Sequence, residues 1–540
     1  MDRRAFLASL ARAVSAPPAD ALLAHWPLVS DARDISGNHR HGIAHGVRFS
    51  ASGAEFDGRN SKIEVPPSPA LDLGARDFTI SAELELAPDS DDIGGGILRK
   101  FDPARRRGFV LAIRDNAVTT SLANYRNLHF GIDDGRGAAG WVDEGRPGRS
   151  VFTMALAVHQ GELYAGTCEP EEGAAGRVWR RAGRGRWIDC GSPDRANAVS
   201  ALASYRGHLY AGTAKYRLAG SALPESANPY PGGRVFRLED DGSWRDCGRL
   251  GEATAVACLT VFGGKLYASS LYAPAGTYRY EGGDRWVACG TPGGLRVVAL
   301  GVFNGHLYGT GYDKGQVYRY LGGSDWEIVG ELPDTTQTYS LVVYRGSLYV
   351  STWPTATVFR YEGDRRWSPA GRPGRELESM ALAVYNGKMY VGTLPHAEVY
   401  RYEDQDRWTR LAELDRTPDV RYRRAWSMAV FQGRLFCGTL PSGRVWSMEA
   451  GRNATWDREL APGRHHVAAV RGGGRLRLYL DGVEVARSEP FSPGDYDLTN
   501  REPLLIGAGD QDVLDGRLRD VRLYERALAP AEIAALARAG

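Results

Sequence analysis

Short runs of alternating hydrophobic and polar residues fill the middle of the chain, and one pattern of them recurs. The pattern is an apolar segment, a turn glycine, a Leu-Tyr pair, a small residue before Gly-Thr, a loop, and a Val-aromatic-Arg segment ahead of a tryptophan, with some positions varied between copies. Alternation at a period of two, broken by tight turns, predicts β-strands. The Leu-Tyr pair or its equivalent occurs seven times, at Leu163-Tyr164, Leu209-Tyr210, Leu266-Tyr267, Leu307-Tyr308, Leu348-Tyr349, Met389-Tyr390 and Leu435-Phe436.

The spacing of these copies predicts a β-propeller. The second residue of the pair recurs at intervals of 46, 57, 41, 41, 41 and 46 residues. Periods of about 40–50 residues that contain short strands and tight turns are typical of a four-stranded propeller blade. Seven copies therefore predict seven blades, which we place at residues 139–451. The repeat is similar to the kelch repeat in outline, although it lacks the kelch double glycine and also the Asp-box repeat of sialidases.

A tryptophan upstream of the first copy predicts how the ring closes. Six copies carry a tryptophan eight residues after the aromatic residue of the Val-aromatic-Arg segment, in which Thr277 replaces Val in the third copy, but the seventh copy, Val445-Trp446, lacks a tryptophan at that spacing. The segment that starts at Trp141 matches the form of the segment that starts at Trp367. We expect Trp141 to begin the outer strand of the last blade, because pairing strands from the two ends of a propeller leaves no open edge.

The two flanks of the repeats carry motifs that arrive in one family's order. Together they resemble a laminin-G-like, concanavalin A-type lectin jelly roll of the bacterial type, split into residues 21–138 and 452–540. The motifs are His25-Trp26-Pro27-Leu28, Phe56-Asp57-Gly58, His465-His466-Val467, Asp481-Gly482 and Asp520-Val521-Arg522. The resemblance implies an all-β fold: a concanavalin A-like jelly-roll sandwich with an inserted seven-bladed β-propeller. The insertion falls where residues 128–131 should turn into the strand around Trp456, and residues 530–536 predict a short C-terminal helix.

Members of this lectin-like family commonly bind a structural calcium ion. The residues here that match the family's loop and its C-terminal Asp-Val-Arg motif are Asp34, Asn38 and Asp520. The resemblance therefore implies calcium as the one candidate cofactor, since clustered oxygen ligands suit this ion. The alternative is that Asp34 and Asn38 only shape a turn.

Charge, cysteines and the N-terminus narrow the setting. A formal net charge of +2 gives no argument for a nucleic-acid partner, and no apolar stretch is long enough for a membrane span. Residues 1–20, with Arg3-Arg4, predict either a twin-arginine export signal or a short helix. The six cysteines form no metal-type pair and predict free thiols, which fits a cytoplasmic protein or one exported after folding. The sequence does not predict the oligomeric state.

Counting back from each turn glycine predicts which residues line one mouth of the propeller. Residues that enter the first strand of a blade and residues that leave the second lie on the same face, because the two strands are antiparallel. This face collects aromatic and charged side chains that suit a sugar or a peptide. The candidate ligand residues are Arg296, Asp313, Lys314, Gln337, Tyr339, Trp353, Glu378, His396, Arg424 and Trp426.

These observations predict a non-catalytic binding protein for a glycan or a protein, acting through the jelly roll, the propeller mouth or both. One alternative is a glycoside-processing enzyme of sialidase-like or lyase-like type, with Glu378, Asp313 and Tyr339 as its catalytic residues, since glycosidases use paired carboxylates. A second alternative is a structural scaffold for protein interactions.

Overall fold

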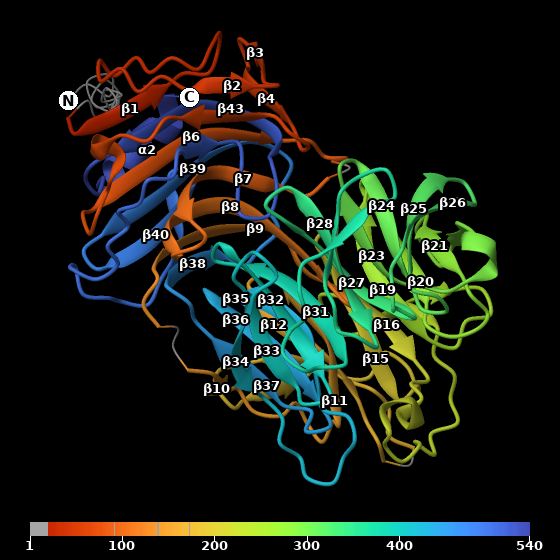
Figure 1. Cartoon of the computed structure of the whole chain (residues 1–540). Coiled ribbons are helices and arrows are strands. Elements are labelled where there is room, and N and C mark those ends of the chain that lie inside the picture. Colours follow the sequence, from red (N-terminus) through yellow and green to blue (C-terminus); the bar gives the residue numbers. More distant parts are fainter. Residues whose placement is uncertain (1–19, 91, 138–139, 172, 540) are drawn as a thin grey trace, which may run out of the picture.

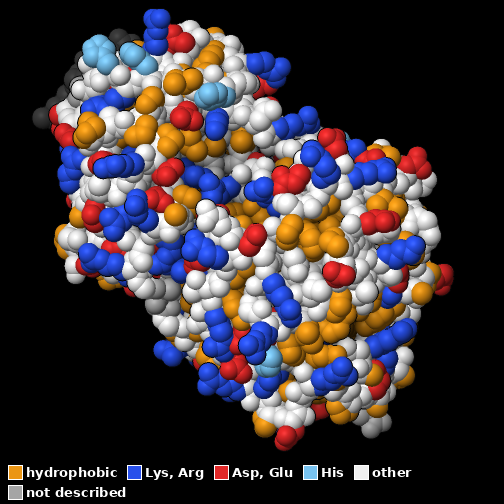
Figure 2. Space-filling model, viewed as in Figure 1, with side chains coloured by type: hydrophobic (Ala, Val, Ile, Leu, Met, Phe, Trp, Pro, Cys, Tyr) orange, Lys and Arg blue, Asp and Glu red, His pale blue; other side chains and the backbone are white. Residues whose placement is uncertain are grey.

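A computed structural model of the chain describes residues 20–90, 92–137, 140–171 and 173–539. The expected export signal or N-terminal helix falls on residues that lie, apart from Asp20, outside the described ones. Two lobes make up the described molecule: a two-sheet β-sandwich, in which strands from the two flanks of the chain lie side by side, and a propeller built from its middle (Figure 1). The space-filling view shows the same two lobes (Figure 2).

The first sheet of the sandwich combines strands from both ends of the chain. Its order is β3-β4-β43-β6-β39-β40-β41, with β1 also paired to β43. The strands are β1 (Leu22–Trp26), β3 (Arg48–Ser50), β4 (Gly53–Asp57), β6 (Phe78–Leu86), β39 (Gly463–Gly472), β40 (Arg475–Leu480), β41 (Val483–Arg487) and β43 (Asp515–Tyr524).

The second sheet also joins the two flanks, in the order β38-β9-β8-β7-β42-β5-β2. Its strands are β2 (Ile43–His45), β5 (Lys62–Val65), β7 (Gly95–Asp102), β8 (Arg107–Val118), β9 (Ser121–Asp134), β38 (Arg452–Trp456) and β42 (Leu504–Ile506). Leu128 of β9 pairs with Trp456 of β38, so the chain leaves and re-enters this sheet on neighbouring strands. The domain boundaries 21–138, 139–451 and 452–540 stay a prediction.

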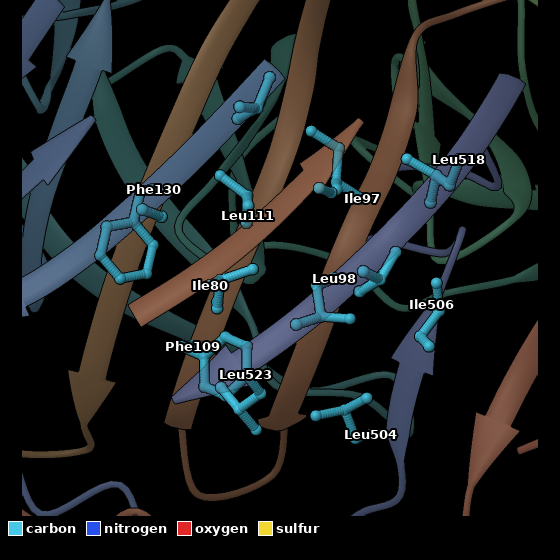
Figure 3. Close-up of a cluster of buried hydrophobic side chains, with 14 of the residues drawn as sticks. Ile80, Ile97, Leu98, Phe109, Leu111, Phe130, Leu504, Ile506, Leu518 and Leu523 are labelled. Carbon is cyan, nitrogen blue, oxygen red and sulfur yellow. The ribbon is translucent and has the colours of Figure 1, made fainter. Parts of the chain in front are cut away.

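One hydrophobic core fills the space between the two sheets. Leu98, Phe109 and Phe130 of the second sheet are buried in the same cluster as Ile80 and Leu523 of the first (Figure 3). Because each sheet buries one apolar face against the other, removal of this surface from water is the main force that holds the two flanks together. The helix α2 (Pro530–Ala539) packs Ile533 and Leu536 into a smaller cluster beside β39.

Five four-stranded antiparallel sheets stand apart as separate propeller blades in the described residues. Four of them run from the innermost to the outermost strand in chain order. Their strands are β19 (Val256–Phe262), β20 (Lys265–Ser270), β21 (Thr277–Tyr280) and β22 (Trp286–Ala288); β23 (Val297–Phe303), β24 (His306–Gly311), β25 (Gln316–Gly322) and β26 (Asp325–Glu331); β27 (Gln337–Tyr344), β28 (Ser347–Trp353), β29 (Phe359–Tyr361) and β30 (Trp367–Pro369); and β31 (Glu378–Tyr385), β32 (Lys388–Leu394), β33 (Glu398–Tyr402) and β34 (Trp408–Glu413).

The fifth separate blade brings the two ends of the propeller together. Its order is β35-β36-β37-β10, from β35 (Arg424–Phe431), β36 (Arg434–Leu440) and β37 (Val445–Met448) to the short strand β10 (Val142–Asp143). Val142, directly after Trp141, pairs with Ser447 at the outer edge of this sheet.

The predicted count of seven separate blades is not confirmed. The strands of the first two repeats pair in the orders β11-β12-β13-β14 and β15-β16-β17-β18. A single bridge from Cys168 to Ala198 joins the two repeats to each other, and a single bridge from Ala203 to Leu122 joins them to β9. These bridges merge both repeats with the second sandwich sheet into one 15-stranded sheet. Their strands are β11 (Phe152–His159), β12 (Glu162–Cys168), β13 (Val178–Arg181), β14 (Trp187–Asp189), β15 (Ala198–Tyr205), β16 (His208–Ala214), β17 (Arg234–Leu238) and β18 (Trp244–Arg249). The physical reason is that part of the sandwich enters the propeller.

That part is the hairpin of β8 and β9, whose tip occupies the centre of the ring. Thr119 Oγ1 donates to the carbonyl of Trp426 at 3.2 Å, and Thr120 Oγ1 donates to that of Met154 at 3.3 Å. Further hydrogen bonds join the hairpin to other innermost strands, so that it contacts β11, β15, β19, β27, β31 and β35. The central channel is therefore filled from the sandwich side.

Two asparagines fix the hairpin in the ring by the same contact. The side-chain amide of Asn124 bonds to the backbone of Val430, with Nδ2 donating to the carbonyl at 2.7 Å and Oδ1 accepting from the N–H at 2.9 Å. Asn116, which faces Asn124 across the hairpin, makes the same pair of bonds to Val384 in the preceding blade. Each asparagine thus satisfies the free edge of an innermost strand as a neighbouring strand would.

The tryptophans predicted to mark the outer strands link each repeat to the one before it. Trp286 Nε1 donates to the carbonyl of Cys247 at 2.8 Å, and Trp187 Nε1 donates to that of Glu144, in the segment that follows Trp141, at 2.9 Å. The same bond is made by Trp244, Trp326, Trp367 and Trp408. Each acceptor lies three residues after a tryptophan, so the recurrence reflects packing between repeats rather than ligand binding.

All six cysteines are free thiols, as the sequence predicts. No helix within the described ranges has the length and apolar character to cross a membrane.

Candidate functional site

A cavity opens at the end of the central channel that faces away from the sandwich. The turns at the other end contact the sandwich: the N–H of Gly346 donates to the carbonyl of Gln511 at 2.9 Å, and that of Gly387 donates to Asp510 Oδ2 at 2.8 Å. The cavity has an empty volume of about 1010 Å³ with its open mouth included, and Thr120 at the hairpin tip is among its lining residues. Because the hairpin fills the channel below, the cavity is a cup closed at one end.

Four of the ten predicted ligand residues line this cavity: Arg296, Tyr339, Arg424 and Trp426. They come from three different repeats. Each lies at or near the start of an innermost strand, which is the position that the count from the turn glycines selects. Tyr339 lies edge-on to Trp426, with ring centroids 6.3 Å apart. Their role in binding stays a prediction.

Three further tyrosines complete an aromatic wall. Tyr216, Tyr272 and Tyr312 lie in the loops after the second strands of their repeats and line the same cavity. The Tyr312 and Tyr339 rings are 6.0 Å apart in an edge-to-face arrangement. Arg296 lies over the Tyr312 ring, with its Cζ 4.5 Å from the centroid. Such edge-to-face and cation–π contacts hold the rings in fixed orientations around the cup.

The long loop of the second repeat explains the 57-residue interval in the sequence. It contains the short 3₁₀ turn η3 (Leu218–Ser221) and covers one side of the cup. Tyr216 and Ser221 of this loop accept hydrogen bonds from Nη1 of Arg424, which belongs to the last repeat. Glu225 also lines the cavity, but its carboxylate accepts backbone N–H groups of η3 and so is committed to holding the loop.

Asp313 and Lys314 lie beside the cavity rather than in its lining. Arg296 donates to both oxygens of Asp313, with the backbone N–H 2.8 Å from Oδ2. Burial would raise the pKa of Asp313, but the hydrogen bonds from Arg296 hold it below its usual value. Asp313 therefore stays ionised and orients Arg296, while Lys314 is exposed.

Glu378 is buried behind the cavity wall, with 2 % of its surface exposed. Burial raises its pKa to about 7, against a smaller lowering by the charge of Arg424 and a hydrogen bond with Tyr339. Its Oε1 has no hydrogen-bond partner within the part of the chain that is described. Gln337, the neighbour of Tyr339, accepts a hydrogen bond from the Tyr339 hydroxyl.

The remaining two predicted ligand residues lie elsewhere. Trp353 packs edge-on against Tyr422, with centroids 6.3 Å apart, at the edge of the apolar cluster beside the cavity. His396 is paired through Nδ1 with Glu376 at 2.5 Å, outside the cavity lining. The sequence count missed Thr120, because that residue comes from the sandwich and nothing in the repeat pattern points to it.

The residues predicted to bind calcium are occupied by other contacts. Asp34 accepts three backbone N–H groups at 2.9 Å, and Asn38 Nδ2 donates to two carbonyl groups of β1. Asp520 Oδ1 is 2.6 Å from His25 Nε2 and also pairs with Arg522. These contacts do not fit the oxygen shell of a calcium ion and favour the loop-shaping alternative. Among the described residues, no group of three His, Cys, Asp or Glu side chains is placed to hold a metal ion, and calcium binding itself stays a prediction.

Comparison with known proteins supports the sandwich independently. A model of the concanavalin A-like lectin/glucanases superfamily matches residues 406–534, from the strands of the last blades through the second flank. The chain contains a concanavalin A-like domain. The lectin-like domain and the propeller together indicate a binding role. The other half of this domain, residues 21–138, lies outside the matched span.

Solved structures give a weaker likeness. A streptogramin B lyase is 10% identical over 57% of this chain and 97% of its own, with a TM-score of 0.45. A virginiamycin B lyase from Staphylococcus aureus is 9% identical over 57% of this chain and 98% of its own, with a TM-score of 0.46. Neither likeness carries an argument about function. No curated protein sequence matches the chain.

The pH dependence of stability tests the burial of Glu378. Its folded-state pKa is raised from 4.5 to about 7, so the stabilisation from its protonated form is fully present below pH 4.5 and is lost as the pH rises through 7. We expect Glu378→Gln to gain about 3 kcal/mol relative to wild type between pH 5 and pH 8, measured by urea unfolding. The difference between the two proteins isolates Glu378, because Asp457 titrates in the same range in both. If the free energies of unfolding of wild type and Glu378→Gln changed with pH in parallel, Glu378 would be solvated rather than buried.

Proposed function

We propose that this protein is a non-catalytic recognition module that holds a glycan in the mouth of its propeller. The observation that carries the proposal is the cup itself: a cavity whose empty volume, with its open mouth included, is about 1010 Å³, closed below by the hairpin and lined by five aromatic side chains with arginines between them. Aromatic faces pack on the C–H faces of sugar rings, and the arginines and hydroxyl groups fix the orientation of the sugar hydroxyls.

The closed bottom of the cup favours the terminus of a glycan chain over an extended peptide as the ligand. A peptide bound along a groove needs a row of backbone hydrogen-bond partners, such as a free sheet edge. Here the innermost strands use their backbone groups on the hairpin, at Val384 and Val430 among others. A compact group that enters from one side therefore suits the cup better.

Removing one aromatic ring tests the proposal. In glycan-array and calorimetric measurements we expect Tyr272→Ala to weaken glycan binding by about 3- to 10-fold, since one aromatic contact contributes about 0.5–1.5 kcal/mol. The matched control is Tyr278→Ala in the same repeat, on the third strand of the blade, β21, and outside the cavity. Equal binding by both variants, or binding of no glycan at all, would contradict the proposal.

A glycoside-processing enzyme is the second candidate, because the environments of two carboxyl groups differ. Burial raises the pKa of Glu378, whereas Arg296 holds that of Asp313 low, which is the division of roles expected of an acid and a nucleophile or base. Neither carboxyl group lines the cavity, and this favours binding without turnover. Hydrolysis or elimination of a bound glycan that Glu378→Gln abolishes would replace the binding proposal. Stable co-purification of one protein without a glycan signal would favour a scaffold.

A further inference from the structure

Among the described residues, Arg424 is a buried charge with no carboxylate in direct contact, although its charge acts on the pKa of Glu378 behind the cavity wall. Its surface is 8% exposed, and it lines the mouth cavity. Within the described residues, no Asp or Glu oxygen lies within 4.0 Å of its guanidinium group, whereas the buried Arg114 has Asp510 at 3.0 Å and the buried Arg106 has Asp133 at 3.6 Å. A guanidinium group is always charged, and an unpaired buried charge is costly.

Two N–H groups at this place have no acceptor. Nη1 of Arg424 is used by Tyr216 and Ser221, but Nε is buried and has no partner among the described atoms. Nε1 of Trp426, two residues further along β35, is likewise buried without a partner, and this side chain is also only 8% exposed. Both side chains line the same cavity, and the guanidinium carbon lies 5.9 Å from the centre of the indole ring.

The chemistry of these groups selects the ligand. An indole N–H and a guanidinium N–H can only donate, so their missing partner must accept. A group that accepts from both and also balances the charge of Arg424 is an anion with more than one oxygen, as a carboxylate is. The acidic side chain in the cavity lining, Glu225, is already used by η3.

We propose that the cup recognises the terminal residue of an acidic glycan, a uronic acid, with its carboxylate on Arg424 Nε and Trp426 Nε1 and its ring against the aromatic wall. This rests on the proposed function and adds the ligand's chemical class and its orientation. Only a chain end fits, because Thr120 and the hairpin close the bottom of the cup. The tyrosine hydroxyl groups around the wall supply partners for the sugar hydroxyls.

The test compares acidic and neutral sugars of the same shape. Titration calorimetry is done with disaccharides that end in glucuronic or galacturonic acid and with the same disaccharides that end in glucose or galactose. We expect the acidic forms to bind at least about 10-fold more tightly, since a hydrogen bond to a charged group has this effect or more. Arg424→Gln should remove this preference.

Trp426→Phe keeps an aromatic ring but removes the pyrrole part of the indole with its N–H group, and it provides a second variant if Arg424→Gln fails to fold. We expect it to weaken binding of the acidic disaccharide about 3- to 10-fold more than binding of the neutral one, because only the acidic sugar uses the N–H group. Arg245→Gln, an exposed arginine on the outer strand β18, is the matched control.

Several outcomes would overturn the inference. Equal affinity for acidic and neutral sugars would do so, as would an acid preference that survives both substitutions, or binding of an acidic peptide in place of the sugar. Neutral sugars that bind the cup as tightly as acidic ones and lose affinity on Tyr272→Ala would overturn the inference alone. If no glycan binds the cup, the proposed function fails as well.

Discussion

Replacing Asn124 with leucine is expected to lower the free energy of unfolding by about 4 kcal/mol. Leucine has the same branched skeleton as asparagine but no polar atoms, so the buried N–H and carbonyl of Val430 both lose their partner. Each buried backbone group left without a hydrogen bond costs about 1–3 kcal/mol. The loss is large because the hairpin joins the two lobes, and a denaturant titration followed by tryptophan fluorescence measures it.

The matched control for this variant is Asn60→Leu. Asn60 lies in an exposed turn of the sandwich, so the same substitution should change stability by less than about 0.5 kcal/mol. Asn116→Leu should resemble Asn124→Leu, because it removes the equivalent pair of bonds to Val384. If both hairpin variants unfold like wild type, the hairpin is not anchored in the ring.

Replacing Arg114 with methionine is expected to cost about 3–5 kcal/mol, the range for breaking a buried ion pair by removing one partner. Arg114 and Asp510 are each 1% exposed and lie 3.0 Å apart, where the sandwich meets the turn of the sixth repeat at Gly387. Arg114 Nη2 also donates to His129 Nδ1 at 2.7 Å. Burial and the charge of Arg114 lower the pKa of His129 to about 4, which keeps this nitrogen an acceptor at neutral pH.

A double variant separates the charge from the packing. Arg114→Met with Asp510→Asn removes both charges together and should recover part of the loss, because the uncompensated carboxylate is gone. Thermal unfolding of the two single variants and the double variant gives the coupling energy. If the loss of stability in the double variant equalled the sum of the losses in the two single variants, a direct interaction between Arg114 and Asp510 would be contradicted.

Much of the fold follows from local patterns in the sequence. Residues that alternate at a period of two form the strands, and the regular spacing of tryptophans such as Trp286 records a contact that each repeat makes with its neighbour. The split sandwich is also visible, since its motifs lie on both sides of the repeats. Each of these features is set by residues close together in the chain or by strict repetition.

The hairpin in the ring could not be predicted in this way. Asn116, Thr119, Thr120 and Asn124 are polar and surround a turn, which is the ordinary pattern of a surface loop. Their burial depends on contacts with strands up to about 300 residues away, for which the sequence holds no local signal. The same insertion merges the first two repeats with the sandwich sheet, which is why the predicted count of seven separate blades was wrong.

The candidate site was predicted in part for a related reason. Residues at the start of the innermost strands are placed by the repeat itself: Arg424 and Tyr339 reach the cavity, whereas Glu378 lies behind its wall. Residues in the loops after the second strands are placed by the loop conformation, which differs between repeats. His396 therefore pairs with Glu376 outside the cavity, whereas Tyr216 lies inside it.

A crystal structure of the protein with a glucuronate-terminated disaccharide tests the central claim most directly. We expect the sugar in the propeller cup, with its carboxylate within hydrogen-bond distance of Arg424 Nε and Trp426 Nε1 and with Thr120 beneath it. The competing place is the cleft between the sandwich and the first two repeats, lined by Tyr125, Arg126 and Trp456 among others. A sugar bound in that cleft, with the cup free of ligand, would contradict the account.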